Sequence, residues 1–138
     1  MSKVSIVIPA RNEPFLNKTI DEIYAKATGE IEVIAVLDGV IPEVLPKERP
    51  NLTLIKWETA KGMRPCINDG AAIATGKYLM KIDAHCALDE GFDEKLAEDC
   101  DEDWVVIPRR YSLADETWTP RRAPIDYMYL SFPDPEKI

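Results

Sequence analysis

The sequence predicts an α/β fold in which helices cover both faces of a mostly parallel β-sheet. Short apolar runs rich in β-branched residues alternate with segments whose apolar residues recur at helical spacing. The runs are apolar at nearly every position, which is typical of parallel strands that are buried on both faces. The chain has 138 residues, of which 46% are hydrophobic, so it is long enough to bury the core of one such domain.

The first half of the chain contains the signals for a strand, a helix and two further strands. Pro9 stops the first β-branched run, and Gly29 ends the first helical pattern. A loop with several prolines separates the second apolar run from the third. The expected elements are a strand at 4–8, a helix at 16–27, and strands at 33–37 and 52–57.

The second half continues the alternation of helices and strands. The expected elements are helices at 63–74 and 92–100 and strands at 78–82 and 104–107. Pro65 suits the first turn of the first of these helices, and Gly76 suits its exit. After the last strand the pattern dissolves into a segment rich in proline and aromatic residues. We therefore expect one domain at 1–108 and a tail at 109–138 that packs on the domain or on a partner subunit.

Composition and charge exclude several classes of protein. The net charge of −8 argues against nucleic acid as the main partner. No apolar run reaches the roughly 20 residues that span a bilayer, and no leader pattern precedes the first strand, so we expect a cytoplasmic protein without a membrane span. One histidine and three cysteines without a Cys-x-x-Cys pair exclude a zinc finger and predict reduced, mostly buried thiols. We expect the apolar tail to mediate the formation of a homo-oligomer.

Polar or charged side chains follow four of the expected strands. Ligands bind outside the carboxyl ends of the strands in open α/β sheets, and those ends share one edge when the strands are parallel. We therefore expect the four segments that follow these strands, here called strand exits, to meet at one edge of the sheet. The exits contain Pro9 to Glu13, Asp38, Lys61 to Arg64, and Asp83 to His85.

The exit Asp83-Ala84-His85 is the most informative of the four. Residues i and i+2 at a strand end project to the same side, so the carboxylate and the imidazole can reach one ion. This pair of ligands suits Mn²⁺ well and Mg²⁺ less well. Two protein ligands are typical where the phosphates of a nucleotide complete the shell of the metal. The alternative is a surface aspartate that caps a turn beside a half-buried histidine.

The other exits allow two interpretations each. Asp38 either opens a turn by bonding its own backbone or accepts hydrogen bonds from a ribose or a base. Arg11 and Arg64 are either solvated surface residues or phosphate-binding groups, and Arg64 stands at the start of a helix, where backbone N–H groups add to the attraction. Cys86 lacks a second base beside it, so we interpret it as a core residue and not as a nucleophile.

Taken together, these residues resemble the donor half of a family 2-type glycosyltransferase with the Rossmann-like GT-A fold. The resemblance covers residues 3 to 107, and the Asp83-Ala84-His85-Cys86 string is especially similar to the polypeptide N-acetylgalactosaminyltransferases. The motifs that carry it are Pro9-Ala10-Arg11-Asn12-Glu13, Asp38, the helix start from Gly62 to Gly70, and Gly76-Lys77-Tyr78 ahead of Asp-x-His.

The resemblance implies a UDP-sugar donor, with UDP-N-acetylgalactosamine as a candidate, and a divalent cation, Mn²⁺ or Mg²⁺. Asp83 and His85 would hold the metal, and Asp83 and Arg64 would be the catalytic residues. By the same resemblance, the residues that contact the nucleotide-sugar would be Pro9, Arg11, Glu13, Asp38, Arg64 and Ala84.

The sequence also departs from this family. Relatives continue into an acceptor-binding half with a further histidine on the metal, whereas this chain has one histidine and a short tail. We therefore expect a minimal or truncated glycosyltransferase with an unknown acceptor and some donor hydrolysis. An inverting reaction would need a carboxylate base, for which Glu116 and Asp126 are candidates. The alternative is a non-catalytic nucleotide-sugar-binding module. A nucleotidyltransferase is disfavoured because no glycine-rich loop follows the first strand.

Overall fold

The computed structural model describes residues 3–125, which fall into two compact units divided between Val106 and Ile107. The first unit holds a four-stranded sheet and its helices, and the second holds a two-stranded sheet. The elements of the first unit are β1 (Val4–Ala10), α1 (Leu16–Lys26), β2 (Ile31–Asp38), β3 (Leu52–Trp57), α2 (Met63–Ile73), β4 (Tyr78–Lys81) and α3 (Phe92–Glu98). Those of the second are β5 (Arg110–Ala114) and β6 (Thr119–Ile125).

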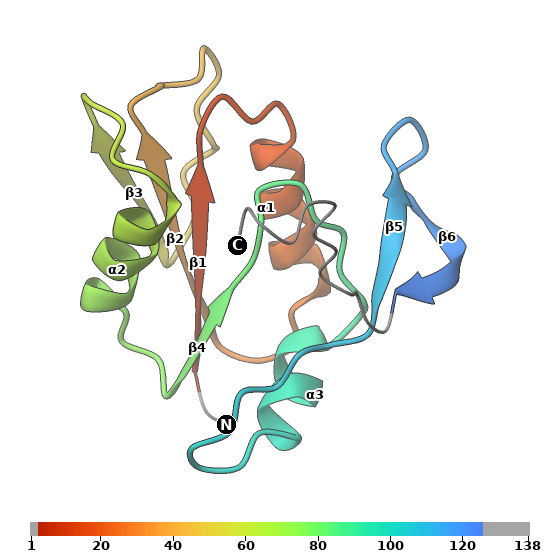
Figure 1. Ribbon diagram of the computed structural model, residues 1–138. Coiled ribbons are helices and arrows are strands. Elements are labelled where there is room, and N and C mark those ends of the chain that lie inside the picture. Colours follow the sequence, from red (N-terminus) through yellow and green to blue (C-terminus); the bar gives the residue numbers. More distant parts are fainter. Residues whose placement is uncertain (1–2, 126–138) are drawn as a thin grey trace, which may run out of the picture. The chain divides into compact units, whose positions relative to one another are not determined.

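The four-stranded sheet has the order β3-β2-β1-β4, and every pair of neighbouring strands is parallel (Figure 1). From β1 to β3, each new strand is added on the same side of the previous one, whereas β4 is added on the other side of β1. The strand order therefore reverses at β1, and ligands bind at the carboxyl ends of the strands beside such a reversal. The predicted α/β class with a parallel sheet is confirmed.

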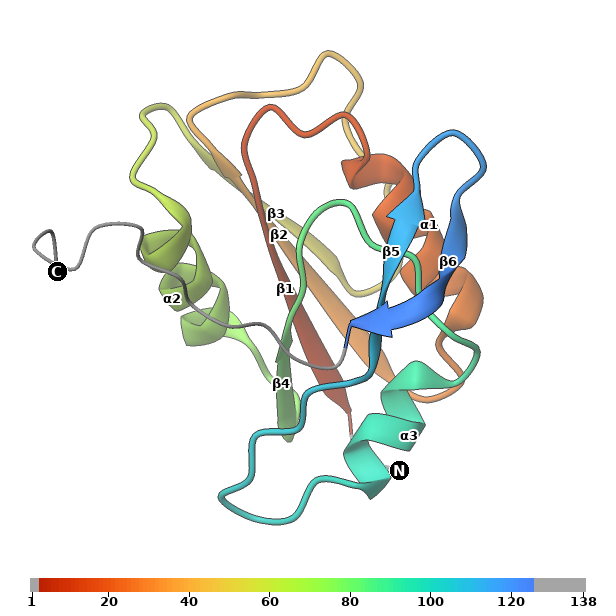
Figure 2. The ribbon, with the colours of Figure 1, turned by 45° about the vertical axis from the view of Figure 1, so that its right-hand side comes forward.

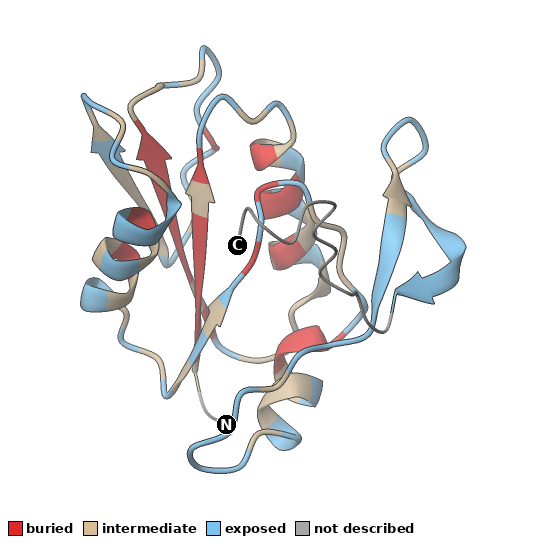
Figure 3. Cartoon of the chain, viewed as in Figure 1, coloured by how far each residue is buried: buried red, intermediate tan, exposed pale blue. Residues whose placement is uncertain are grey.

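Helices cover both faces of this sheet, as Figure 2 shows. The buried face of α1, together with Phe92 at the start of α3, packs on one side of β1 and β2. Cys66 of α2 packs on the opposite side, against Val7, Ile34 and Val36. The two central strands are buried along almost their whole length (Figure 3) because each of their faces has a helix over it. This double coverage explains the continuous apolar runs of the sequence.

One glycine allows α2 to lie unusually close to the sheet. A Cβ atom at Gly70 would stand 2.5 Å from Cγ1 of Val7, a distance that real Cβ contacts do not reach. A larger residue would push α2 away from β1. Because α2 begins at the carboxyl edge of the sheet, this close packing also sets the position of the residues at the start of the helix.

The first strand is longer than predicted, because Pro9 does not stop it. β1 continues to Ala10, and Pro9 is paired with Val36 of β2. On its other side, β1 is paired with β4 only as far as Val7. Beyond Val7 the strand has one free edge, where the missing N–H of a proline is tolerated.

The predicted strand at 104–107 is wrong. The segment is irregular, and Trp104, Val105 and Ile107 are 63%, 89% and 75% exposed. No strand among residues 3–125 pairs with it. Apolar composition favours an extended backbone, but a strand also needs a neighbour with which to form hydrogen bonds.

The tail contains regular structure that the sequence did not predict. β5 and β6 form an antiparallel hairpin, in which Pro120 and Pro124 are accommodated because each strand of a two-stranded ribbon has a free edge. Glu116 is exposed in the connecting turn. Asp126 and the residues after it lie outside the described residues, so self-association through the tail stays a prediction.

No helix in the described part of the chain is long and apolar enough to cross a membrane.

Glu32 ties three segments together at the amino edge of the sheet. Its carboxylate accepts hydrogen bonds from the Ser5 hydroxyl, from the Thr75 backbone N–H at 2.8 Å and from the Thr75 hydroxyl at 3.1 Å. Lys3 Nζ lies 3.7 Å from Oε1 of the same carboxylate. Burial alone would raise the pKa of Glu32, but these hydrogen bonds and the Lys3 charge together lower it below its ordinary value.

We expect Glu32→Gln to lower the free energy of unfolding at neutral pH by about 1–2 kcal/mol, because bonds to a charged acceptor are lost. A carboxyl group whose pKa is lowered by folding stabilises the protein above its unfolded pKa, about 4.3, and loses this contribution as the pH falls through the folded value. The difference between wild type and variant should therefore shrink in acid. Urea unfolding at several pH values measures it, with Glu30→Gln as an exposed control. A difference that stays constant from about pH 7 to pH 3 would contradict the expectation.

Candidate functional site

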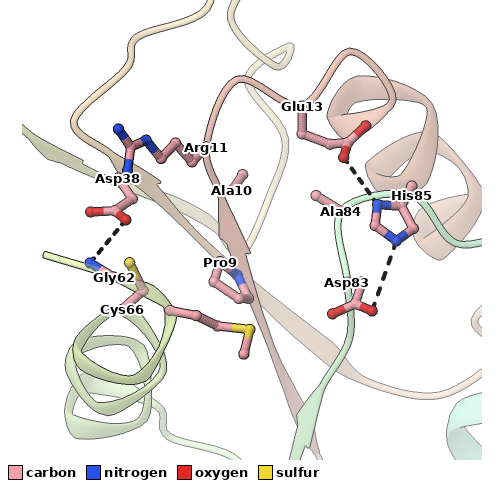
Figure 4. Close-up of a pocket in the computed structure, with 11 residues that line it drawn as sticks. Pro9, Ala10, Arg11, Glu13, Asp38, Gly62, Cys66, Asp83, Ala84 and His85 are labelled. Carbon is pink, nitrogen blue, oxygen red and sulfur yellow. Dashed lines mark hydrogen bonds and ion pairs between the residues drawn. The ribbon is translucent and has the colours of Figure 1, made fainter. Parts of the chain in front are cut away.

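A cavity of about 340 Å³ opens at the carboxyl edge of the sheet, beside the point where the strand order reverses (Figure 4). Its walls come from the ends of β1, β2 and β4 and from the start of α2. The lining residues are Pro9, Ala10, Arg11, Glu13, Asp38, Gly62, Met63, Cys66, Asp83, Ala84 and His85. The cavity is thus built where parallel α/β sheets bind their ligands.

The structure brings seven of the eight predicted site residues into this cavity and leaves Arg64 outside. Arg64 is exposed and is not among the residues that line the cavity. Successive residues of an α-helix are about 100° apart around its axis, so the helix turns Arg64 away from the wall that Met63 forms. The sequence analysis did not predict Met63 and Cys66 as lining residues of the site. They are three positions apart in a helix, which places both on one helical face, and this spacing could have indicated that they share a wall with Gly62.

Asp38 is buried, with 4% of its surface exposed, and holds the loop that precedes α2. Its Oδ1 accepts a hydrogen bond from the backbone N–H of Lys61 at 2.6 Å, and its Oδ2 accepts one from that of Gly62 at 3.0 Å. One of the two interpretations of Asp38 was a turn closed by a bond from the carboxylate to the neighbouring backbone. That interpretation is wrong, because the carboxylate accepts its hydrogen bonds from a segment more than twenty residues further along the chain. Asp38 therefore fixes one wall of the cavity.

Gly39 brings the same loop into direct backbone contact with the end of β2. Its φ is +74°, and a Cβ atom there would stand 2.4 Å from the backbone nitrogen of Ala60. Only glycine suits both the left-handed backbone and this close approach. Together, Gly39 and the Asp38 carboxylate attach the β3–α2 loop to the carboxyl end of β2.

The cavity carries more negative than positive charge. Three carboxylates line it, those of Glu13, Asp38 and Asp83, against the single guanidinium of Arg11. In Figure 4 the Arg11 side chain extends on the Asp38 side of the cavity, and Glu13 and His85 lie on the opposite side. A phosphate-bearing ligand would meet net repulsion in this cavity unless a cation accompanied it.

The cysteines at and near the cavity are not activated nucleophiles. Burial raises the pKa of the Cys66 thiol, and the carboxylates of Asp38 and Asp69 raise it further. Burial and the Asp83 charge likewise raise the pKa of Cys86. A thiol must be deprotonated to attack, so both side chains act as packing groups. All three cysteines of the chain are free, as predicted, but only Cys66 is fully buried.

His85 is held between two carboxylates that come from different parts of the chain. Its Nδ1 lies 3.0 Å from Oε2 of Glu13, and its Nε2 lies 3.8 Å from Oδ2 of Asp83 (Figure 4). Asp83 also pairs with Lys81. The hydrogen bond from Lys81 outweighs desolvation and lowers the pKa of Asp83, and the charge of Lys81 lowers it further, as does His85 when its ring is protonated. Asp83 is therefore an ionised oxygen donor beside an imidazole nitrogen.

The family of the chain follows from comparison of its sequence with known families. The sequence model of the family described as "Glycosyl transferase family 2" matches residues 5–136, which is nearly the whole chain. The chain belongs to glycosyl transferase family 2. The resemblance inferred from the strand exits and the Asp-x-His motif is thereby confirmed.

A curated glycosyltransferase is similar in sequence to this chain. The chain is 29% identical over 115 aligned residues to putative polypeptide N-acetylgalactosaminyltransferase 13 of Drosophila melanogaster. The alignment covers 70% of this chain and 21% of that protein, so the chain spans about a fifth of the length of its relative. The similarity agrees with the group that the Asp83-Ala84-His85-Cys86 string indicates.

Two solved structures share the fold of this glycosyltransferase family member. The first is residues 1–349 of S. aureus TarS, with a TM-score of 0.57, 18% identity, and coverage of 70% of this chain and 31% of that one. The second is the mannosyltransferase PcManGT from Pyrobaculum calidifontis in complex with GDP-Man and Mn²⁺, with a TM-score of 0.54, 20% identity, and coverage of 65% and 29%. At these identities the likeness establishes the fold, which is the GT-A fold.

Proposed function

We propose that this glycosyl transferase family 2 domain binds a UDP-sugar donor together with a divalent cation, and that Asp83 and His85 are the protein ligands of the cation. The observation that carries the proposal is the pair of donor atoms, Asp83 Oδ2 and His85 Nε2, which the segment after β4 places at the cavity. An oxygen and an imidazole nitrogen together suit Mn²⁺ better than Mg²⁺.

The residues around this pair support a metal site. Its interaction with Lys81 lowers the pKa of Asp83, which favours the charged form of the carboxylate. The other nitrogen of the His85 ring contacts a carboxylate at 3.0 Å, as is usual for histidines that bind metals. Within residues 3–125, no group of three or more His, Cys, Asp or Glu side chains is placed to hold a metal by itself. The remaining ligands would therefore come from the diphosphate of the donor, so that the metal and the nucleotide would each strengthen the binding of the other.

The nucleoside would occupy the opposite side of the cavity. Arg11 supplies the positive charge there, and Asp38 is held in one orientation by two backbone N–H groups. Each carboxylate oxygen of Asp38 retains a lone pair that a base or ribose group can use. Pro9 would complete this wall, and Ala84, which lies between Asp83 and His85, would contact the donor from their side of the cavity. The name of the Drosophila relative supports N-acetylgalactosamine as the transferred sugar.

The reaction would be transfer of the sugar from its nucleotide to an acceptor. The cation, when bound, would stabilise the negative charge on the departing diphosphate. Asp83 and His85 would fix the position of the diphosphate, and Arg11 would add a second positive charge on the donor side. Arg64, which the structure places outside the cavity, has no direct role in this proposal. Turnover also requires that an acceptor be held in line with the sugar, so a domain that binds the donor without releasing UDP would be a binding module.

The proposal predicts that UDP and Mn²⁺ strengthen each other's binding by the same factor, about 5- to 150-fold. The physical reason is that two protein ligands bind the cation weakly until the diphosphate completes its shell. Isothermal calorimetry of UDP with Mn²⁺, and then with a chelator, measures the factor. GDP serves as the control for the choice of base. If chelation leaves the affinity for UDP unchanged, the proposed metal role is wrong.

A further inference from the structure

The contact between Glu13 and His85 joins two strand exits that are 72 residues apart in the sequence. Glu13 follows β1 and His85 follows β4. Glu13 Oε2 lies 3.0 Å from Nδ1 of His85, while Glu13 Oε1 accepts a hydrogen bond at 3.2 Å from the backbone N–H of Phe15, next to α1. The Glu13 side chain is 21% exposed and that of His85 is 56% exposed. Glu13 is therefore the fixed partner, and it restrains the more exposed imidazole.

The chemistry of this contact determines which ring nitrogen carries the proton. An ionised carboxylate only accepts hydrogen bonds, so the nitrogen that faces Glu13 must be the donor. In the neutral ring the proton is then on Nδ1, and the lone pair is on Nε2. The Nε2 atom is the one that faces Asp83, at 3.8 Å from Oδ2. The Glu13 carboxylate thus directs the basic nitrogen of the ring toward the other proposed ligand.

We propose that Glu13 is a positioning residue that holds His85 as its Nδ1–H tautomer and thereby makes Nε2 the metal-facing atom. This inference rests on the proposed metal role of Asp83 and His85. It also assigns Glu13 a task that the family resemblance does not imply. Its Oε1 is engaged by Phe15 and its Oε2 by His85, so Glu13 would act on the metal site through the histidine.

The tautomer can be read directly, because His85 is the only histidine of the chain. Long-range ¹H–¹⁵N NMR correlations of the imidazole, on a chain without a histidine tag and without metal at about pH 8.5, report it. We expect the Nδ1–H form in the wild type and in Glu13→Gln, whose amide oxygen can still accept the bond. In Glu13→Ala the ring should move toward the Nε2–H form. A wild-type ring in the Nε2–H form would overturn the inference even if Glu13→Ala failed to fold.

The second readout is metal affinity. With UDP present, Glu13→Ala should weaken Mn²⁺ binding by about 10- to 100-fold, the usual cost of removing the partner of a metal-binding histidine. Glu13→Gln should recover much of this loss, and Glu30→Ala, an exposed control, should change nothing. If Mn²⁺ fails to bind the wild type while the tautomer depends on Glu13, the proposed function fails and the positioning role stands. If Mn²⁺ binds the wild type and the tautomer is the same in Glu13→Ala, the positioning role is wrong and the proposed function stands.

Discussion

Asp83→Ala is expected to abolish the coupling between UDP and Mn²⁺ while leaving the cooperative unfolding of the domain intact. Asp83 supplies one of the two proposed protein ligands, so its removal should weaken Mn²⁺ binding in the presence of UDP by more than about 100-fold. Its structural contribution is small, because half of the side chain is exposed and its bond to Lys81 is a surface ion pair, worth about 0–1 kcal/mol. Large loss of function with little loss of stability is the signature of a binding residue.

Calorimetry and thermal unfolding of the same preparation separate these two effects. Asp89→Ala is the matched control, because Asp89 is an exposed carboxylate that pairs with Lys95 in the way that Asp83 pairs with Lys81. Release of UDP from a panel of UDP-sugars, compared between wild type and Asp83→Ala, then distinguishes a transferase from a binding module. If Asp83→Ala unfolds without cooperativity, or keeps its metal coupling, the carboxylate is structural and the site assignment is wrong.

Asp38→Ala is expected to lower both the stability of the domain and its affinity for UDP. The substitution removes two hydrogen bonds to a buried carboxylate and leaves the part-buried N–H groups of Lys61 and Gly62 without this acceptor, which should cost about 2–4 kcal/mol of unfolding free energy. It also frees the loop before α2, and with it the Gly62 and Met63 wall of the cavity. The affinity for UDP should therefore fall through the loss of the carboxylate and of the ordered wall together.

Urea unfolding measures the stability, and UDP titration at saturating Mn²⁺ measures the affinity. Glu58→Ala is the control, because Glu58 is an exposed carboxylate in the same β3–α2 loop. Asp38→Asn keeps one acceptor oxygen, so its loss of stability should lie between those of wild type and Asp38→Ala. An Asp38→Ala protein as stable as the wild type would show that the two amide contacts contribute nothing. Unchanged UDP affinity would remove Asp38 from the proposed nucleoside site.

The sequence by itself determined which segments form the strands and helices of the first unit, and it determined that their sheet is parallel. Both depend on local information: runs such as Val33 to Leu37 are apolar at every position, and the face from Leu16 to Ile23 repeats at helical spacing. The Asp83-Ala84-His85 motif is also recognised from local sequence, although β4 ends at Lys81, so the two side chains follow the strand and do not alternate within it. These features required no knowledge of distant contacts.

Only the tertiary structure decided which distant groups meet. The parallel register that pairs Val4 with Tyr78 brings the exits of β1 and β4 to the same edge, and this places Glu13 against His85. Nothing near either residue in the sequence encodes that hydrogen bond, just as nothing near Asp38 encodes its bonds to the loop before α2. Conversely, the apolar run at 104–107 has the composition of a strand but finds no partner among the described residues. Local patterns fix the conformation that a segment favours, whereas its partners depend on how the whole sheet brings remote segments together.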